Sequence, residues 1–296
     1  MSAARSCRIE CGGVRLHARV RRTDSLAPRR PVVVLHGFTG DAESMVCVSR
    51  QLAADTSVAR VDLIGHGRSE APRELALYTM ERCAEQVSAL MDALALERPH
   101  LVGYSMGGRV ALALGALDPA RVASALVIGT SAGIDDPLER ARRRDADEAL
   151  AARILREGVP AFVEAWMANP LFASQQRLGA DALARARRQR LRNRAHGLAL
   201  SLRGMGTGAQ PPLAEALRKL APPVCFVVGA EDAKFRALAG KLAPSLRDAR
   251  VEAIPAAGHA AHLENPAAFG RVMRRFHAAV EGREASHSAE ARAALT

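Results

Sequence analysis

A serine in a sharp turn between a strand and a helix is the feature of this chain best suited to chemistry. Ser105 lies in the run Gly103-Tyr104-Ser105-Met106-Gly107, which follows His100-Leu101-Val102 and precedes a stretch of helical character. Glycines in such a turn let the backbone take the strained conformation that lifts the serine hydroxyl above a sheet. A serine hydroxyl reacts at neutral pH only when an adjacent base accepts its proton. The pattern therefore predicts a nucleophile elbow with Ser105 at its apex.

Two later segments offer a base and an acid to orient it. His259 follows Gly258 in a loop after the last expected strand, which places the imidazole at the carboxyl edge of a parallel sheet, beside the elbow. Glu231 and Asp232 follow the preceding strand. We prefer Asp232, because its shorter side chain lies in a tight loop, whereas Glu231 is expected to face solvent. The predicted catalytic residues are therefore Ser105, Asp232 and His259.

Stabilising a developing oxyanion takes two backbone N–H donors. One comes from the residue after the nucleophile and the other from the loop after an early strand. Met106 and Phe38 occupy these positions. We interpret His36 as a residue that shapes this loop, because His259 already supplies the general base. Residues 62–69 are rich in turn formers, and we interpret them as a structural turn.

The elements that must position these residues alternate between strand and helix. Residues 7–21 alternate apolar and polar around Gly12-Gly13, which predicts a hairpin. Apolar spacing predicts helices over 79–96 and 266–280. Buried strands are predicted over 31–36, 57–63, 99–104, 123–129, 223–229 and 249–254. The fold class is therefore α/β, with a mostly parallel sheet flanked by helices.

The strand signal stops between residues 135 and 211, where arginine-rich helical segments replace it. We expect a helical cap at 135–211, inserted between two parts of one core at 1–134 and 212–280. Residues 281–296 are small and polar, and we expect them to be disordered. Between Leu138 and His196 the cap carries 13 arginines against seven acidic residues. Most of these arginines are expected to face solvent.

Composition limits the function classes. The chain of 296 residues is 49% hydrophobic, long enough for one large domain with an insertion. The net charge of +11 comes with 39 arginines, three lysines and only 3% aromatic residues, and no nucleic-acid-binding motif is present. We therefore expect no nucleic-acid partner.

Cysteines and apolar runs bear on location. The five cysteines are scattered without metal-ligand spacing, so we expect reduced thiols and no metal site. No apolar run approaches the roughly 20 residues of a membrane span, and the first residues lack the apolar segment of a signal peptide. We expect a cytoplasmic protein without stable membrane insertion.

These motifs together resemble the α/β-hydrolase superfamily over residues 32–279, including its order of serine, acid and histidine along the chain. Several segments are similar to one subfamily, the 2-succinyl-6-hydroxy-2,4-cyclohexadiene-1-carboxylate synthases of menaquinone biosynthesis. They are residues 103–109, 166–172, 201–210, 232–235 and 258–264.

The resemblance implies a lyase that needs no cofactor. It would eliminate pyruvate from 2-succinyl-5-enolpyruvyl-6-hydroxy-3-cyclohexene-1-carboxylate, with the triad sharpening Ser105 for proton abstraction and the oxyanion hole holding an enolate. The partner is a small polycarboxylate substrate, and the protein is a monomer or homodimer. By the family pattern the substrate-binding residues are Tyr104, Arg109, Arg143, Trp166 and Arg192.

Two alternatives share the fold. A cofactor-independent serine hydrolase acting on esters or on carbon–carbon bonds would use the same triad. A non-catalytic binding protein of this fold is the third possibility, but it predicts the loss of a triad residue, and none is lost.

Overall fold

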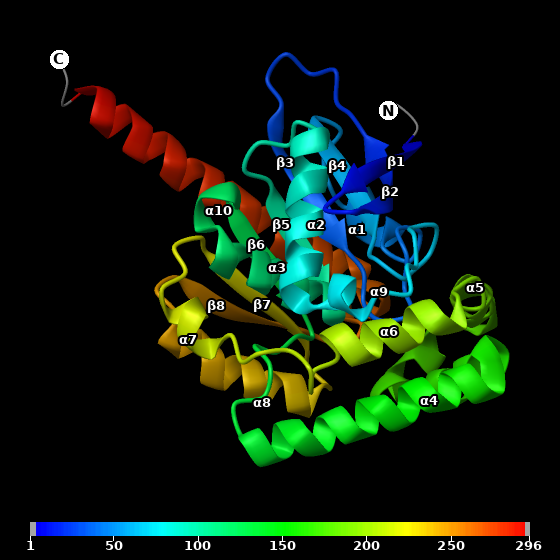
Figure 1. The fold of residues 1–296 in the computed structure, drawn as a ribbon. Coiled ribbons are helices and arrows are strands. Elements are labelled where there is room, and N and C mark those ends of the chain that lie inside the picture. Colours follow the sequence, from blue (N-terminus) through cyan, green and yellow to red (C-terminus); the bar gives the residue numbers. More distant parts are fainter. Residues whose placement is uncertain (1–3, 294–296) are drawn as a thin grey trace.

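A single eight-stranded sheet forms the centre of the molecule, in the strand order β1-β2-β4-β3-β5-β6-β7-β8 (Figure 1). The computed structural model describes the backbone of residues 4–293 and the side chains of residues 4–286. From β4 to β8 all neighbouring strands are parallel, and β1 and β2 form the predicted hairpin at one edge. The strands are β1 Arg5–Cys11, β2 Val14–Arg21, β3 Arg29–Leu35, β4 Thr56–Asp62, β5 His100–Tyr104, β6 Ser124–Ile128, β7 Val224–Gly229 and β8 Ala249–Ile254. The predicted α/β fold class is confirmed.

Helices cover both faces of the sheet, so its central strands are buried on both sides and carry mainly apolar residues. Every residue of β6 and β7 is buried, as expected for strands without a solvent face. One core lies between the sheet and helices α2, α3 and α8, and the other lies between the sheet and helices α1, α9 and α10. Their bounds are α1 Val46–Arg50, α2 Met80–Ala93, α3 Met106–Leu117, α8 Ala233–Leu242, α9 Ala261–Glu264 and α10 Pro266–Ala293. Short helices α7 Ala214–Arg218, η1 Leu75–Tyr78, η2 Pro119–Arg121 and η4 Ala243–Ser245 complete the connections.

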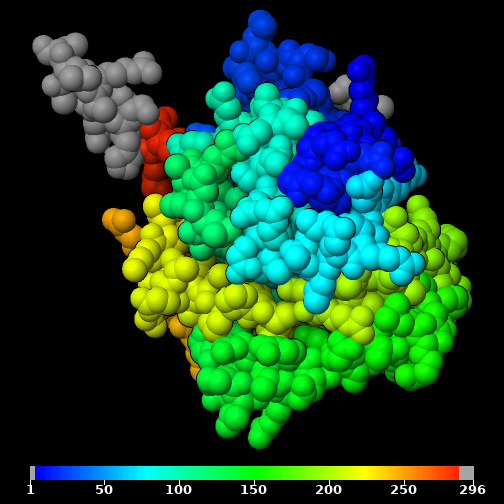
Figure 2. All heavy atoms as spheres, in the orientation of Figure 1, coloured from blue at the N-terminus to red at the C-terminus, as the bar shows by residue number. Residues whose placement is uncertain are grey.

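Four helices lie within residues 135–211, where the helical cap was expected. They are α4 Pro137–Met167, η3 Pro170–Leu178, α5 Ala180–Arg190 and α6 Ala195–Met205. Helix α4 begins at an N-cap, since the side chain of Asp136 accepts a hydrogen bond from the N–H of Glu139 at 2.7 Å. Figure 2 shows these helices as one continuous layer against the rest of the molecule.

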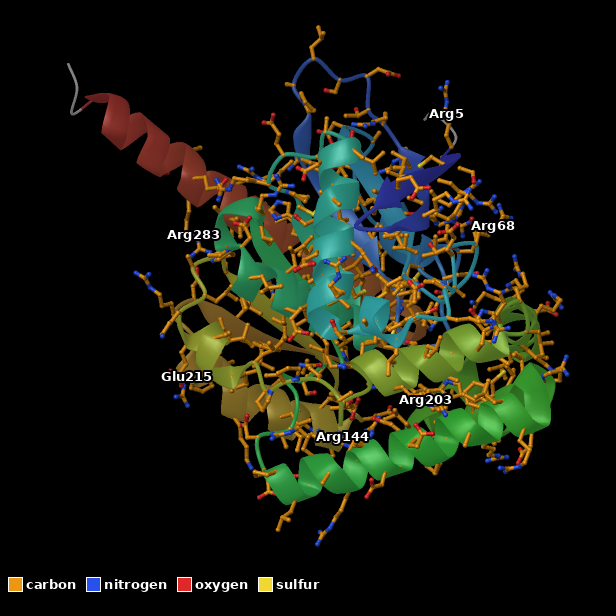
Figure 3. The ribbon with its side chains drawn as sticks, in the orientation of Figure 1. Arg5, Arg68, Arg144, Arg203, Glu215 and Arg283 are labelled. Carbon is orange, nitrogen blue, oxygen red and sulfur yellow. The ribbon has the colours of Figure 1, made fainter. Side chains whose placement is uncertain are left out.

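A third apolar core holds this layer together. Phe162 and Val163 of α4 pack with Leu198 and Leu202 of α6. At the surface, Arg203 of α6 donates to Glu148 of α4 at 2.8 Å, and Figure 3 shows many more charged side chains on the outside of these helices. The layer therefore has its own apolar interior and a charged exterior.

The last helix is longer than predicted. The structure describes residues 281–293, where disorder was expected, as a continuation of α10, which ends at Ala293 and leaves the body of the molecule (Figure 1). Glu281 lies 3.5 Å from Arg29, and Glu284 pairs with Arg98 at 3.1 Å and with Arg30. These arginines belong to β3 and to the loop before β5, so contacts distant in sequence extend the helix. The last three residues of the expected tail lie outside the described residues.

Two further findings concern expectations from composition. All five cysteines are free thiols. No helix among the described residues combines the length and the apolar character that a membrane span requires.

The packing of α10 gives a stability prediction. Phe276 is 2% exposed, and the guanidinium of Arg250 lies 4.7 Å from its ring centre. Replacing it with alanine leaves a cavity, so we expect Phe276→Ala to lower the free energy of unfolding by about 3–5 kcal/mol. Urea unfolding followed by circular dichroism measures this loss.

The matched control is Leu138→Ala, because Leu138 of α4 is 69% exposed. We expect a change within about 0.5 kcal/mol for this variant. Equal effects of the two substitutions would contradict the packing described here.

Candidate active site

Ser105 occupies the strand–turn–helix geometry that its motif predicts. It lies between the end of β5 and the start of α3, with φ of 50° and ψ of −108°. A side chain on Gly103 would place its Cβ 2.4 Å from the carbonyl oxygen of Gly107, and one on Gly107 would lie 2.4 Å from the carbonyl oxygen of Leu35. Only glycine fits at these two positions, so the turn can pack directly against β3.

The structure brings Ser105, His259 and Asp232 together. The Nε2 atom of His259 lies 3.3 Å from Ser105 Oγ, and its Nδ1 atom lies 2.9 Å from Asp232 Oδ2. Asp232 follows β7, and its Oδ1 accepts a hydrogen bond from the N–H of Phe235 at 3.2 Å. Both His259 and Asp232 are buried, whereas Glu231 is exposed. The geometry allows His259 to accept the serine proton while Asp232 orients the imidazole.

The two expected oxyanion donors belong to the start of α3 and to the loop after β3. Met106 is the first residue of α3, so its N–H has no acceptor within the helix. Phe38 follows β3, and its ring packs edge-on against Trp166 with ring centres 5.4 Å apart. Both residues line the cavity that contains Ser105.

The loop that carries Phe38 is held by His36. Its Nδ1–H donates to the carbonyl of Gly37 at 2.8 Å, and its Nε2 accepts from the N–H of Leu63 at 3.0 Å. Burial lowers the pKa of His36, which agrees with a neutral ring that donates through one nitrogen and accepts through the other. His36 therefore shapes the loop, as predicted.

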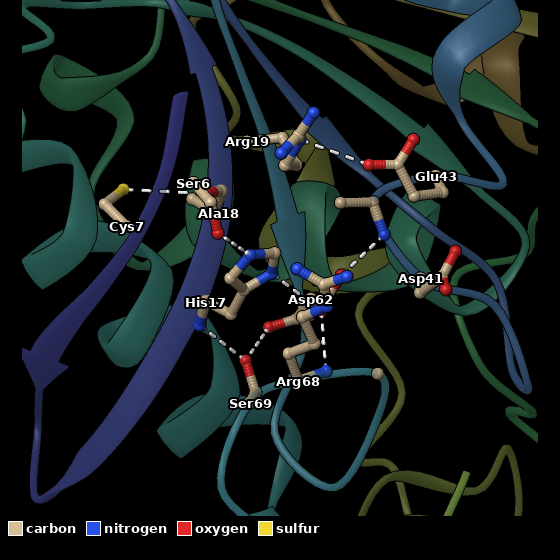
Figure 4. A network of polar contacts seen from close by, with 12 residues as sticks. Ser6, Cys7, His17, Ala18, Arg19, Asp41, Glu43, Asp62, Arg68 and Ser69 are labelled. Carbon is tan, nitrogen blue, oxygen red and sulfur yellow. Dashed lines mark hydrogen bonds and ion pairs between the residues drawn. The ribbon is translucent and has the colours of Figure 1, made fainter. Parts of the chain in front are cut away.

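Asp62 forms the centre of a second network behind this loop (Figure 4). Its carboxylate accepts hydrogen bonds from the Nδ1–H of His17 at 2.8 Å, from the N–H of Arg68 at 2.7 Å and from the N–H of Ala42 at 2.6 Å. Burial alone would raise the pKa of Asp62, but these hydrogen bonds keep it below its usual value. The turn at residues 62–69 is structural, since it joins β2 and β4 to the loop after β3.

The cavity above Ser105 has an aromatic wall and a cationic end. It encloses about 170 Å³ between the sheet, α4 and α6. Besides Ser105, His259, Phe38 and Met106, its lining includes the predicted residues Tyr104, Arg109, Arg143 and Trp166. Four of the five predicted substrate-binding residues therefore lie at one cavity.

Arg109 is held rigidly in this cavity. Its Nη1 donates to the carbonyl of Met205 and to Oε1 of Gln210, both at 2.7 Å. Burial, reinforced by the neighbouring charge of Arg143, lowers the pKa of Arg109 to about 10. The guanidinium therefore stays protonated at neutral pH and presents a fixed positive charge.

Sequence reasoning missed several residues of the cavity. Asp147 of α4 accepts a hydrogen bond from Nε of Arg143 at 2.8 Å, and Thr130 Oγ1 donates to the carbonyl of Ser105 at 2.8 Å. Lys234 of α8 and Ser201 of α6 also line the cavity. Only Asp147 had a local signal, because it stands four residues after Arg143 on one helix.

Arg192 lies elsewhere. It lines a second cavity of about 510 Å³ between α5 and α1, together with Arg50, Arg185, Arg188 and Arg190. Phe38 and Tyr104 line both cavities and so stand between them.

Among the described residues, Nε of Arg190 is buried without a hydrogen-bond partner. Burial lowers the pKa of Arg190, while Tyr104 and Asp41 oppose this effect. Neither arginine lines the Ser105 cavity; Arg190 is half-buried in the second cavity, and Arg192 is exposed.

Within the part of the chain whose side chains are described, no three His, Cys, Asp or Glu residues converge as metal ligands. The chemistry that the site itself offers is proton transfer by serine and histidine beside fixed cations.

Comparisons with known proteins place these features in a family. Residues 30–266 match the family described as alpha/beta hydrolase fold. The 2-succinyl-6-hydroxy-2,4-cyclohexadiene-1-carboxylate synthase of Enterobacter sp. (strain 638) is 35% identical over 242 residues, which cover 82% of this chain and 89% of the relative. A Bacillus subtilis (strain 168) protein, whose name gives the same activity as a provisional assignment, is 40% identical over 245 residues, 83% of this chain and 89% of the relative.

A solved structure agrees with these relatives. MenH from S. aureus superimposes with a TM-score of 0.84 at 28% identity, and the match covers 89% of this chain and 98% of that one. The likeness therefore extends through the inserted helices as well as the sheet.

The Asp62 network gives a pH-dependent prediction. In Asp62→Asn one oxygen must serve three donors, so we expect the free energy of unfolding at pH 7 to fall by about 3–5 kcal/mol. The pKa of Asp62 is lowered in the folded state, so its contribution is complete above the unfolded value of about 3.9 and is lost as the pH falls through the folded value.

The difference between wild type and Asp62→Asn should therefore narrow as the pH is lowered below about 4. Urea titrations at pH 7 and at several acidic values measure it. A difference that stays constant across this range would show that the charge of the Asp62 carboxylate does not stabilise the loop.

Proposed function

Because this chain belongs to the alpha/beta hydrolase fold family and, within it, to the 2-succinyl-6-hydroxy-2,4-cyclohexadiene-1-carboxylate synthases, we propose that it eliminates pyruvate from 2-succinyl-5-enolpyruvyl-6-hydroxy-3-cyclohexene-1-carboxylate in menaquinone biosynthesis. The observation that carries the proposal is a serine–histidine–aspartate array in a cavity with fixed arginines. Arg109 and Arg143 lie in that cavity with Ser105, and the substrate has several carboxylates. Such a substrate is attracted by fixed arginine charges and repelled by acidic walls.

Ser105 acts as the base in this reaction. Its Oγ removes a proton from the cyclohexene ring while its own proton passes to Nε2 of His259, 3.3 Å away. The electrons of the broken C–H bond pass through the enolate of the succinyl carbonyl into a new ring double bond, the existing ring double bond shifts by one position, and the bond between the ring and the enolpyruvyl oxygen breaks. The leaving group takes a proton and departs as pyruvate. Asp232 holds the imidazole by its Nδ1 and stabilises its positive charge.

The negative charge that develops on the succinyl carbonyl needs donors that are already in place. We propose that the N–H groups of Met106 and Phe38 supply them. Both groups stand on rigid supports, since Met106 begins α3 and the loop of Phe38 is held through His36. No acyl-enzyme forms in this scheme, so water need not reach Ser105.

We further propose that helices α4–α6 act as a cap that binds the carboxylates. Arg109 and Arg143 take one end of the substrate, with Asp147 keeping Arg143 in position. Trp166 and Tyr104 pack against the ring. We assign a third carboxylate to Arg190, which lines the neighbouring cavity with Tyr104 and whose buried Nε has no hydrogen-bond partner, whereas Arg192 is exposed.

The proposed reaction is tested with purified protein and the enolpyruvyl substrate, by following pyruvate release and diene absorbance. We expect Ser105→Ala to lower kcat by about 10²–10⁴-fold, the usual contribution of a positioned base. A p-nitrophenyl ester serves as the comparison substrate, and we expect only feeble cleavage of it. No release above the spontaneous rate, together with rapid Ser105-dependent ester cleavage, would instead identify a hydrolase.

Arg109 tests the cationic end of the cavity. Loss of a charged hydrogen bond costs about 1.5–3 kcal/mol, so we expect Arg109→Ala to lower kcat/KM by about 10–100-fold. The control is Arg203→Ala, because Arg203 pairs with Glu148 on the outer surface of the same helices. Equal kcat/KM values for the two variants would contradict a carboxylate site at Arg109.

Arg190 and Arg192 form a second matched pair. We expect Arg190→Ala to raise KM by about tenfold, since it removes one charge-assisted contact worth about 1.5 kcal/mol, and Arg192→Ala to change KM by less than about twofold. Steady-state kinetics of both variants measure this difference. The reverse order would assign the third carboxylate to Arg192.

A further inference from the structure

The carboxylate of Glu264 holds the backbone on both sides of His259. Its Oε2 accepts a hydrogen bond from the N–H of Gly258 at 2.8 Å, and its Oε1 accepts one from the N–H of Ala260 at 3.1 Å. The Glu264 side chain is only 2% exposed. One buried carboxylate therefore holds the peptide group that follows His259 and the peptide group that precedes Gly258.

This arrangement controls the direction of the imidazole. Holding these peptide groups limits the backbone torsions around His259, and with them the direction of its Cα–Cβ bond. Hydrogen bonds to an ionised acceptor are about twice as strong as neutral ones. His259 must satisfy two partners at once, with Asp232 at 2.9 Å and Ser105 at 3.3 Å, so a small rotation would break one contact to improve the other.

The same carboxylate connects the histidine loop to the inserted helices. Nη2 of Arg177, in η3, lies 3.7 Å from Oε2 of Glu264 and 2.8 Å from Oε2 of Glu231, which immediately precedes Asp232. Ser174 of η3 also packs on Gly258, where a Cβ would lie 2.1 Å from its Oγ. Segment η3 therefore touches the loops of both the acid and the base.

We propose that Glu264 is a positioning residue for His259, and that it sets the orientation in which the imidazole accepts the proton of Ser105. The inference rests on the proposed roles of Ser105 and His259 in the reaction. It assigns Glu264 no contact with substrate, so its loss should lower the rate of proton transfer and leave substrate binding unchanged.

The experiment compares Glu264→Gln with Glu231→Gln. Both substitutions remove a carboxylate that pairs with Arg177, but only the first disturbs the backbone contacts around His259, because the amide keeps one acceptor oxygen and turns an NH2 donor toward the other N–H. The first readout is the rate at which an alkyl fluorophosphonate modifies Ser105. In that step Ser105 Oγ bonds to phosphorus, fluoride leaves, and His259 takes the hydroxyl proton, so the rate reports the serine–histidine pair without the natural substrate.

Displacement of a reacting group by 1 Å can cost about 100-fold, so we expect a smaller reorientation in Glu264→Gln to slow labelling by about tenfold. With the natural substrate, kcat should fall by a similar factor while KM stays within about twofold. Glu231→Gln should label and turn over within about twofold of wild type. Thermal unfolding establishes that each variant is fully folded at the assay temperature.

The proposal is overturned if Glu264→Gln labels as fast as Glu231→Gln, or if its slower labelling only follows a loss of folded protein. Should Glu264→Gln not fold, Glu264→Asp replaces it, because the shorter carboxylate keeps the charge and cannot span both N–H groups. Slower labelling of folded Glu264→Asp supports the proposal, and wild-type labelling rejects it. Failure of the synthase reaction itself would leave the labelling result intact, so the two failures can be told apart.

Discussion

The left-handed backbone at Ser105 is the constraint around which the rest of the site is built. A non-glycine residue in such a conformation costs about 1–3 kcal/mol and persists only where its surroundings hold it. Here the N–H of Ser105 donates to the carbonyl of Ile128 at 2.8 Å, and Thr130 donates to the carbonyl of Ser105 at 2.8 Å. The buried strands β5 and β6 thus supply the support, and the glycines at 103 and 107 supply the space.

Opposite charges are kept at separate ends of the site. Asp232 and Glu264 lie on the side of the histidine, where negative charge favours the imidazolium that forms when Ser105 gives up its proton. Arg109 and Arg143 lie on the side of the cap, where a polycarboxylate would bind. Two residues are exceptions: Asp147 is an acid among the arginines, where its hydrogen bond to Nε of Arg143 keeps that side chain in place, and Arg177 is a cation that pairs with Glu264. Such a division lets one small cavity attract an anion and still stabilise a cation.

Two buried carboxylates hold functional loops by the same means. Asp62 accepts backbone hydrogen bonds from the loop after β3 and from its own turn, and Glu264 accepts them from the loop of His259. A loop has few apolar contacts of its own, so strong hydrogen bonds to an ionised, buried acceptor are an effective way to order it. Each carboxylate therefore supports one part of the proposed machinery: Asp62 the oxyanion loop and Glu264 the base.

The sequence by itself determined the sheet, the order of its buried strands along the chain and the elbow. The strands follow from local apolar patterns, and the elbow follows from the glycines on either side of Ser105. It also indicated Ser105, Asp232 and His259, which the structure brings together, since each of them follows a predicted strand. Tertiary structure alone decided what depends on contacts distant in sequence. Arginines crowd residues 185–194, and only the tertiary structure leaves Arg190 half-buried and Arg192 exposed. Helix α10 extends past residue 280 because its glutamates meet arginines from β3 and from the loop before β5. Glu264 accepts hydrogen bonds from the neighbours of His259 because α9 packs back against that loop. No spacing of residues in the sequence predicts this packing.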